Sequence, residues 1–208
     1  MSVNIYYGVH IMNSYESLVI ETNRIMDLWK NSRGFAPVDT ADKLEKSMID
    51  LHFEMTKSLG IWIKKGLSMT KGELVLARVN IGAVVESWLK FFYCIYYHDY
   101  IESYKEKGND YNIISKKGKM TQPEKLSFEK LKNFSIGKLW EDKSDTLKWI
   151  EKVQHQRNSI HYFYPKDIGT QQEFLNDIEK LYKFVCDIEY RLPPIEDFYF
   201  EDYWLLKN

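Results

Sequence analysis

The side chains best suited to chemistry gather in one stretch, residues 147–165, which reads Leu-Lys-Trp-Ile-Glu-Lys-Val-Gln-His-Gln-Arg-Asn-Ser-Ile-His-Tyr-Phe-Tyr-Pro. Within it, Arg157 and His161 are four residues apart and would project from one face of a helix. A guanidinium is a permanent cation whose fork of donors grips phosphate, and imidazole titrates near neutral pH. Phosphate chemistry at pH 7 needs this pair of groups. The alternative is a surface helix with ordinary polar residues, which a short motif leaves open.

A helix must position this pair. Apolar residues at helical spacing predict one that begins near Asp145, namely Leu147, Ile150, Val153 and Ile160, with Trp149 beside them. The residue before a proline is pushed out of the α region, so Pro165 predicts that the helix ends near Tyr164.

The other elements read as helices, and strand signals are few, which indicates an all-α helical bundle. We expect helices over residues 14–29, 39–63 and 71–106, a helix start at Pro123, and a last helix between Thr170 and Pro193. Residues 1–12 alternate apolar and polar side chains and predict a short extended segment. Residues 107–121 are polar, with four lysines against one aspartate, and predict an insertion loop.

The segment 71–106 is the longest helical candidate and is apolar almost all round, which is typical of the central helix of a bundle. Its middle carries Glu86, and buried carboxylates are rarely left unpaired. One interpretation is that Arg157 pairs with Glu86 in the core. Such a pair would give Arg157 a structural role, which is compatible with a catalytic one.

The composition favours one compact domain. Residues 1–70 are expected to pack as a helical region on a core at 71–192, followed by an acidic aromatic tail at 193–208. With 208 residues and a formal net charge of −1, nothing global attracts polyanions, so any nucleic-acid site must be a local patch.

Metal and membrane sites are not expected from the sequence. Cys94 and Cys186 have no metal-ligand spacing and are interpreted as buried thiols. His98 has Asp99 and Glu102 nearby but lacks a third ligand, so we expect neither a metal nor another cofactor. The N-terminus lacks a signal-peptide pattern, and the most apolar window, residues 81–97, is too interrupted to span a membrane. The expectation is a cytoplasmic protein.

The segment 156–163, Gln-Arg-Asn-Ser-Ile-His-Tyr-Phe, resembles the signature of the HEPN superfamily, an arginine, a polar spacer and a histidine. The segment 82–90, Gly-Ala-Val-Val-Glu-Ser-Trp-Leu-Lys, is similar to the early core helix of that family. The resemblance covers residues 71–190. It implies an all-helical, usually dimeric domain that cleaves RNA without a metal, with the motifs of two subunits forming one cleft, in a prokaryotic defence or stress response.

The resemblance also implies residue roles. Arg157 would bind the scissile phosphate, and His161 would act as general acid–base on the 2′-hydroxyl or the leaving oxygen. Asn158 would orient phosphate or the helix end, and Glu86 would support Arg157. Separately, the basic run Lys116, Lys117 and Lys119 could touch an RNA backbone, although a solvated loop is the simpler interpretation.

Two departures from the family pattern leave alternatives open. Three residues separate Arg157 from His161, whereas the family usually has four to six. One branch of the family carries a tyrosine, modified by a partner nucleotidyltransferase, where this chain has Phe163. The alternatives are a catalytically inactive module that binds RNA, a nucleotide or a protein, and a toxin silenced by an antitoxin or another regulatory partner.

Overall fold

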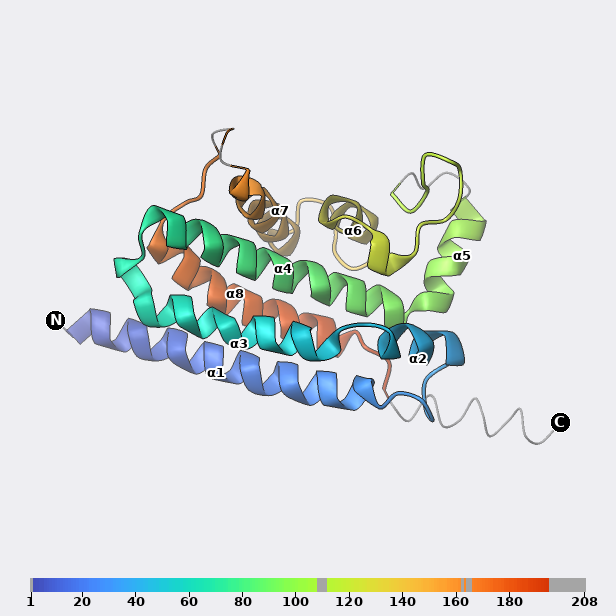
Figure 1. Ribbon diagram of the computed structural model, residues 1–208, viewed down its shortest axis with the longest axis horizontal. Helices are drawn as coiled ribbons and strands as arrows, with labels where there is room; N and C mark the ends of the chain where they lie inside the picture. Colours follow the sequence, from blue (N-terminus) through green and yellow to red (C-terminus); the bar gives the residue numbers. More distant parts are fainter. Residues whose placement is uncertain (1, 108–111, 162, 164–165, 195–208) are drawn as a thin grey trace.

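Helices make up the architecture of the chain. The computed structural model describes residues 2–107, 112–161, 163 and 166–194. This part of the chain contains isolated backbone bridges but no β-strand, which confirms the all-α helical bundle (Figure 1). The α-helices are α1 (Ser2–Lys30), α2 (Val38–Glu45), α3 (Ile49–Lys65), α4 (Lys71–Ile95), α5 (Tyr97–Lys107), α6 (Phe128–Ser135), α7 (Asp145–Arg157) and α8 (Gln171–Tyr190). Three short 3₁₀ helices connect them: η1 (Gly66–Ser68), η2 (Pro123–Lys125) and η3 (Asn158–Ile160).

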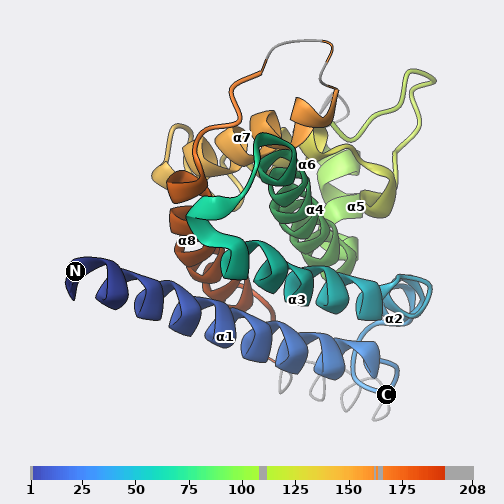
Figure 2. The ribbon, with the colours of Figure 1, turned by 60° about the vertical axis from the view of Figure 1, so that its left-hand side comes forward.

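Helix α4 lies at the centre, as its apolar sequence predicts. It packs against α3 and α8 on one side and against α6 and α7 on the other, while α1 covers α3 and α8 (Figures 1 and 2). One contiguous hydrophobic core joins these helices. Its largest fully buried side chains include Trp29, Trp88, Tyr100, Phe134 and Phe174.

The N-terminal expectations need two corrections. Residues 2–30 form one helix, so the predicted extended segment at 1–12 is wrong. The predicted helix over 39–63 is divided into α2 and α3. The Ser47 hydroxyl donates to the Leu44 carbonyl at 2.6 Å, and Met48 leaves the helical region at φ −92° and ψ 61°. A serine that bonds to the last turn of a helix offers the backbone an alternative to further helix, and the chain turns there.

The predicted helix over 71–106 is also interrupted. Thr70 and Glu73 form a reciprocal capping box at the start of α4, but the helix stops at Ile95. Tyr96 adopts φ −84° and ψ 42°, and its hydroxyl donates to the Arg191 carbonyl at 2.6 Å. This contact ties the break to the end of α8, and α5 then departs in a new direction (Figure 1).

The segment predicted as a loop at 107–121 begins one residue too early, because Lys107 is the last residue of α5, and it is a loop from residue 112 onward, where the structure describes it again. Its base is anchored, because Ile113 is fully buried and the Tyr100 hydroxyl donates to the Thr121 carbonyl at 2.5 Å. The helix start expected at Pro123 is only the short η2, and α6 begins at Phe128 behind its cap Ser127.

The last helix agrees with its prediction. Thr170 caps α8 with a second capping box, made with Glu173, and the helix ends at Tyr190 before Pro193 and Pro194. Of the tail expected at 193–208, residues 195–208 lie outside the described part of the chain.

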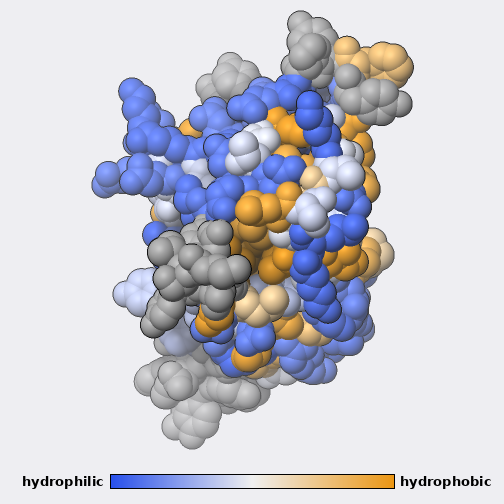
Figure 3. Space-filling model, turned by 90° about the vertical axis from the view of Figure 1, so that its left-hand side faces the viewer, coloured by the Kyte–Doolittle hydropathy of each residue, from blue (hydrophilic) through white to orange (hydrophobic). Residues whose placement is uncertain are grey.

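The end of the bundle where α3 passes through η1 into α4 has an apolar surface. Figure 3 views the molecule from this end and shows hydrophobic side chains gathered in the middle of the face, among hydrophilic ones. In this part of the chain, Ile61, Leu67 and Leu76 are each more than half exposed. Gathered apolar side chains of this kind mark contact surfaces more often than scattered ones do. Among the described residues, no helix is both long and apolar enough to cross a membrane.

Candidate functional site

Helix α7 presents the motif at its C-terminal end. The Ser144 hydroxyl accepts a hydrogen bond from the Leu147 amide and so caps the helix, which begins at Asp145 as predicted. Leu147, Ile150 and Val153 are buried against the core. The buried stripe fixes the rotation of α7 about its axis, and that rotation turns Arg157 towards α4.

The end of α7 differs from the prediction. The helix stops at Arg157, seven residues before Tyr164, and continues only as the 3₁₀ turn η3. The Ser159 hydroxyl donates to the Gln156 carbonyl at 2.6 Å, and His161 lies at φ −86° and ψ 62°. Arg157 and His161 therefore do not share one helical face, because the α-helical repeat that places residues four apart on one face has already ended.

The expected pair between Glu86 and Arg157 is confirmed. Arg157 Nη2 lies 2.7 Å from Glu86 Oε2. The other oxygen of the same carboxylate, Glu86 Oε1, lies 2.9 Å from Lys90 Nζ. The Glu86 side chain is 11% exposed and that of Arg157 is 35% exposed. Glu86 thus holds two cations at the α4–α7 crossing, and part of the Arg157 side chain remains in contact with solvent.

A glycine makes this crossing close enough for the ion pair. Gly82 lies one helical turn before Glu86 on α4, and a Cβ placed on it would stand 2.5 Å from the Cβ and 2.7 Å from the Cγ of Arg157. Carbon atoms in ordinary contact are about 3.5–4.0 Å apart. The absence of a side chain at Gly82 therefore gives the stem of Arg157 its place on α4.

The other polar residues of the motif differ in exposure, and Ser159 is buried. His161 is exposed, and its backbone amide donates to the Asn158 carbonyl at 3.2 Å. Asn158 is half-buried, and His155 is exposed. Within the described residues, no hydrogen bond or ion pair joins the side chains of Arg157 and His161. The structure thus brings Arg157 to Glu86 and leaves His161 open to solvent beside it in the chain.

The basic run predicted as a substrate contact is in a different place. Lys116, Lys117 and Lys119 are all exposed on the loop between α5 and η2. Figure 1 shows this loop at the α5 end of the bundle, whereas the chain that follows α7 lies towards the other end. The three lysines are thus not brought together with Arg157 and His161.

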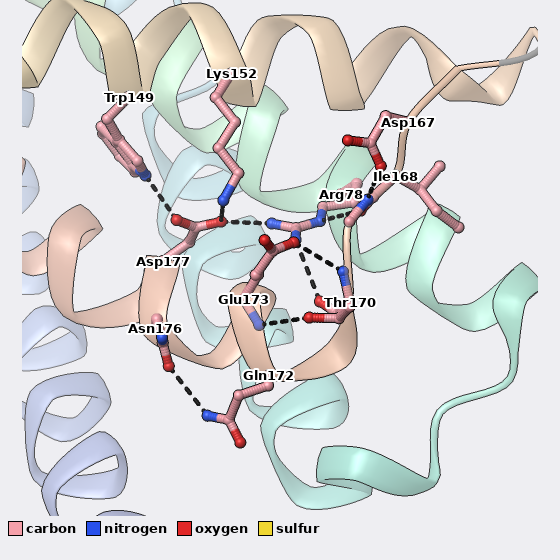
Figure 4. Close-up of polar contacts among 11 residues, drawn as sticks. Arg78, Trp149, Lys152, Asp167, Ile168, Thr170, Gln172, Glu173, Asn176 and Asp177 are labelled. Carbon is pink, nitrogen blue, oxygen red and sulfur yellow. Dashed lines mark hydrogen bonds and ion pairs between the residues drawn. The ribbon is translucent and has the colours of Figure 1, made fainter.

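A buried polar network behind α7 was not predicted from the sequence (Figure 4). Arg78 and Asp177 are both fully buried, and Arg78 Nη1 donates to Asp177 Oδ2 at 2.5 Å. The other oxygen of Asp177 accepts from Trp149 Nε1 at 3.1 Å, and Lys152 Nζ lies 3.3 Å from Oδ2. The sequence did contain a signal for this network. Arg78 on α4 and Asp177 on α8 are charged residues that lie among apolar residues of a buried helix face.

The network also holds the chain that leads from the motif to α8. Arg78 Nε donates to the Ile168 carbonyl at 3.0 Å, and Nη2 donates to the Thr170 carbonyl at 3.3 Å. Between them, Gly169 has φ +65° and is packed against Glu173 and Gln156. Arg78 therefore holds the segment just before α8 against α4, while Glu86 holds Arg157.

The remaining candidate side chains divide between core and surface. Cys94 is buried, and burial raises the pKa of its thiol to about 12, while Cys186 is only half-buried. His52 packs edge-on against Trp88, and burial lowers the pKa of its imidazole to about 4. His98 Nε2 lies 4.0 Å from Asp39. In the part of the chain that the structure describes, no three histidine, cysteine or carboxylate side chains gather as metal ligands.

Two of the cavities between the described helices are lined by neither Arg157 nor His161. The first, of about 890 Å³, lies between α2, α3, α4 and α5 and has a mainly apolar wall. The second, of about 540 Å³, lies between α7 and α8 and is lined by four lysines. Neither of them provides an enclosed catalytic cleft around Arg157 and His161.

Comparisons with known proteins give no relative for this chain. No family model, no curated protein and no solved structure matches it. The similarity to the HEPN superfamily therefore rests on the motif segments alone.

Proposed function

We propose that the protein is a metal-independent endoribonuclease of the HEPN type that acts as a homodimer. One observation carries the proposal: Glu86 holds Arg157 in place at 2.7 Å, while Arg157 stays partly exposed and His161 is open to solvent nearby. A pinned guanidinium is pre-organised for a phosphate, and an accessible imidazole can exchange protons near pH 7. RNA as substrate would place the protein in the cytoplasm.

The proposed chemistry uses the nucleophile that RNA itself carries. An imidazole removes the proton of the 2′-hydroxyl, and the 2′-oxygen attacks phosphorus. The bond from phosphorus to the 5′-oxygen breaks, leaving a 2′,3′-cyclic phosphate, and the 5′-oxygen takes a proton from an imidazolium. His161 from each of two copies would supply the base and the acid, with Arg157 neutralising the charge that develops on the phosphate.

A homodimer supplies what one chain lacks. Ile160 is 44% exposed and Phe163 is 94% exposed, so apolar side chains stand on both sides of His161 in the sequence. Burial of such side chains against a second copy would close a cleft around the motif. The resemblance suggests a setting in prokaryotic defence or stress, in which an antitoxin or another regulatory partner would control the activity.

The second candidate is a catalytically inactive module that binds RNA, a nucleotide or a protein. One observation favours it: the Glu86 carboxylate already pairs with the Arg157 guanidinium. In this alternative Arg157 is a structural residue that fastens α7 to α4.

The deciding experiment compares the wild type with His161→Ala on structured and unstructured RNAs in EDTA. Catalysis predicts loss of cleavage by at least about 100-fold, which is the usual contribution of general acid–base groups. The matched control is His155→Ala, since His155 is an exposed histidine on α7, six residues before His161, and this variant should cleave normally. Thermal melts of all three proteins show whether each is folded.

The outcomes separate the two candidates. Cleavage that is lost only in a normally melting His161→Ala variant assigns His161 to catalysis. RNA that stays intact with every protein favours the binding module. Cleavage that needs added metal contradicts the proposed mechanism.

A further inference from the structure

The groove between α7 and α8 brings lysine side chains from both helices together. Its volume is about 540 Å³, and four lysines from two helices point to the same hollow. The residues that line it are Asp145, Thr146, Lys148, Trp149, Lys152, Lys180, Lys183, Phe184 and Asp187. A concave site with convergent cations is a typical way for proteins to bind anions.

The lysines exceed the carboxylates that could neutralise them. Lys152 lies 3.3 Å from Asp177, but Arg78 already occupies that carboxylate at 2.5 Å, so two cations share one anion. Lys180 is exposed and has no ion-pair partner among the described residues. The groove therefore carries a positive charge that its own side chains leave uncompensated.

The remaining lysines are paired, which limits the excess to about two charges. Lys148 lies 3.3 Å from Asp145, and Lys183 lies 2.6 Å from Glu179. Asp187 lies 3.1 Å from Arg191. Including these direct partners, six cations stand against four carboxylates. Because Lys152 is held against a buried carboxylate, one of the two excess charges has a fixed position.

We propose that this groove binds phosphate groups and that its ligand is the backbone of the RNA substrate. The inference rests on the proposed function and assigns its substrate-binding surface to α7 and α8 in place of the lysine loop at 112–121. On α7, Lys148 and Arg157 are nine residues apart, which is about 14 Å along the axis and about half a turn around it. Arg157 faces α4 and Lys148 lines the groove with α8. An RNA strand that reaches both side chains must therefore pass around the C-terminal end of α7.

We expect the groove to contact the phosphates of RNA without distinguishing its bases. Trp149 is only 6% exposed, and its indole nitrogen is bound to Asp177, so its ring cannot leave the core to stack on a base. Lysine is a point charge that contacts phosphate without reading base edges. The affinity should therefore depend on salt and on strand length, with little dependence on sequence.

The test measures binding of a fluorescein-labelled 12-nucleotide poly-U RNA by anisotropy, with every variant in the His161→Ala protein. Lys180→Gln should weaken binding about 3- to 10-fold, and Lys180→Gln with Lys152→Gln at least about 10-fold. Each lost phosphate contact should also reduce the slope of log affinity against log salt by about 0.7. Lys64→Gln is the matched control, because Lys64 is an exposed lysine on α3 without an ion-pair partner among the described residues.

The results distinguish the sources of phosphate and the failure of each proposal. AMP is also added as a competitor of the labelled RNA. If AMP displaces the RNA from the parent protein but does not bind the double variant, the groove is a phosphate site whose ligand is a free nucleotide. Equal losses in Lys64→Gln and Lys180→Gln, or equally tight and lysine-dependent binding of a poly-glutamate peptide, would overturn it. Because His161 is already replaced, an absence of ribonuclease activity in the wild type leaves this measurement unaffected.

Discussion

Gly82 and Arg157 touch where α4 and α7 cross: a Cβ placed on Gly82 would lie 2.5 Å from the Cβ of Arg157. The ion pair between Arg157 and Glu86 depends on this approach, since Glu86 lies one turn further along the same helix. The absence of a side chain at Gly82 thus allows Arg157 to reach Glu86.

Gly82→Ala should destabilise the protein. The added methyl group forces α4 and α7 apart, and overpacking costs about 1–3 kcal/mol. The better helix propensity of alanine offsets up to about 1 kcal/mol of this cost, so the net loss of stability is up to about 2 kcal/mol. Gly72→Ala on the same helix is the control, because nothing lies within 4 Å of that position, and it should leave stability unchanged or raised. Urea unfolding of both variants measures the difference, and equal stability of the two would contradict the contact.

The buried pair Arg78–Asp177 should show strong coupling. Arg78→Met leaves a buried carboxylate with less compensation, and Asp177→Leu leaves a buried guanidinium without its partner, so each should cost about 3–5 kcal/mol. The double variant removes both charges and should lose clearly less than the sum of the single variants. A double-mutant cycle from chemical denaturation gives the coupling free energy, and strictly additive losses would show that the pair does not act as a unit.

His52 should make the stability of the protein depend on pH. Burial lowers the pKa of its imidazole from 6.5 to about 4, so between these values the unfolded chain binds the proton and the folded chain does not. The free energy of unfolding therefore rises with pH through this window, and the contribution of His52 is lost as pH falls from about 6.5 towards 4. The largest effect of this one group is about 3 kcal/mol.

The measurement compares the wild type with His52→Phe, which keeps an aromatic ring beside Trp88 but cannot titrate. The difference in the free energy of unfolding between the two proteins should change by up to about 3 kcal/mol between pH 7 and pH 4. A constant difference across this range would show that the imidazole titrates alike in the folded and unfolded states.

Phe163→Asp should separate the proposed homodimer into single chains. Phe163 is 94% exposed beside the motif, and burial of an aspartate in an interface is unfavourable. Light scattering after gel filtration should show half the mass, with RNA cleavage reduced in parallel. Tyr190→Asp is the control, because Tyr190 is 90% exposed at the end of α8, away from the motif in sequence. A wild type that is a single chain at micromolar concentration would reject the composite site.

Local sequence patterns predicted most of the elements and one long-range pair. The spacing of apolar residues located α7 and α8 and placed their starts near Asp145 and Thr170, because this signal acts within one or two helical turns. The pair of Glu86 with Arg157 was also predicted, since a carboxylate in the middle of an apolar helix needs a cation.

Tertiary structure decided the points at which chain segments far apart in sequence meet. Tyr96 ends α4 with its hydroxyl bound to a carbonyl 95 residues away, and Arg78 joins Asp177 across 99 residues. The spacing of residues within one helix carries no information about contacts between residues so far apart in the sequence. The sequence by itself determined the all-α class, the central helix and the partner of Glu86. Only the packed structure decided that Gly82 makes room for the Arg157 side chain and that four lysines meet in one groove, because both depend on the distance between separate helices.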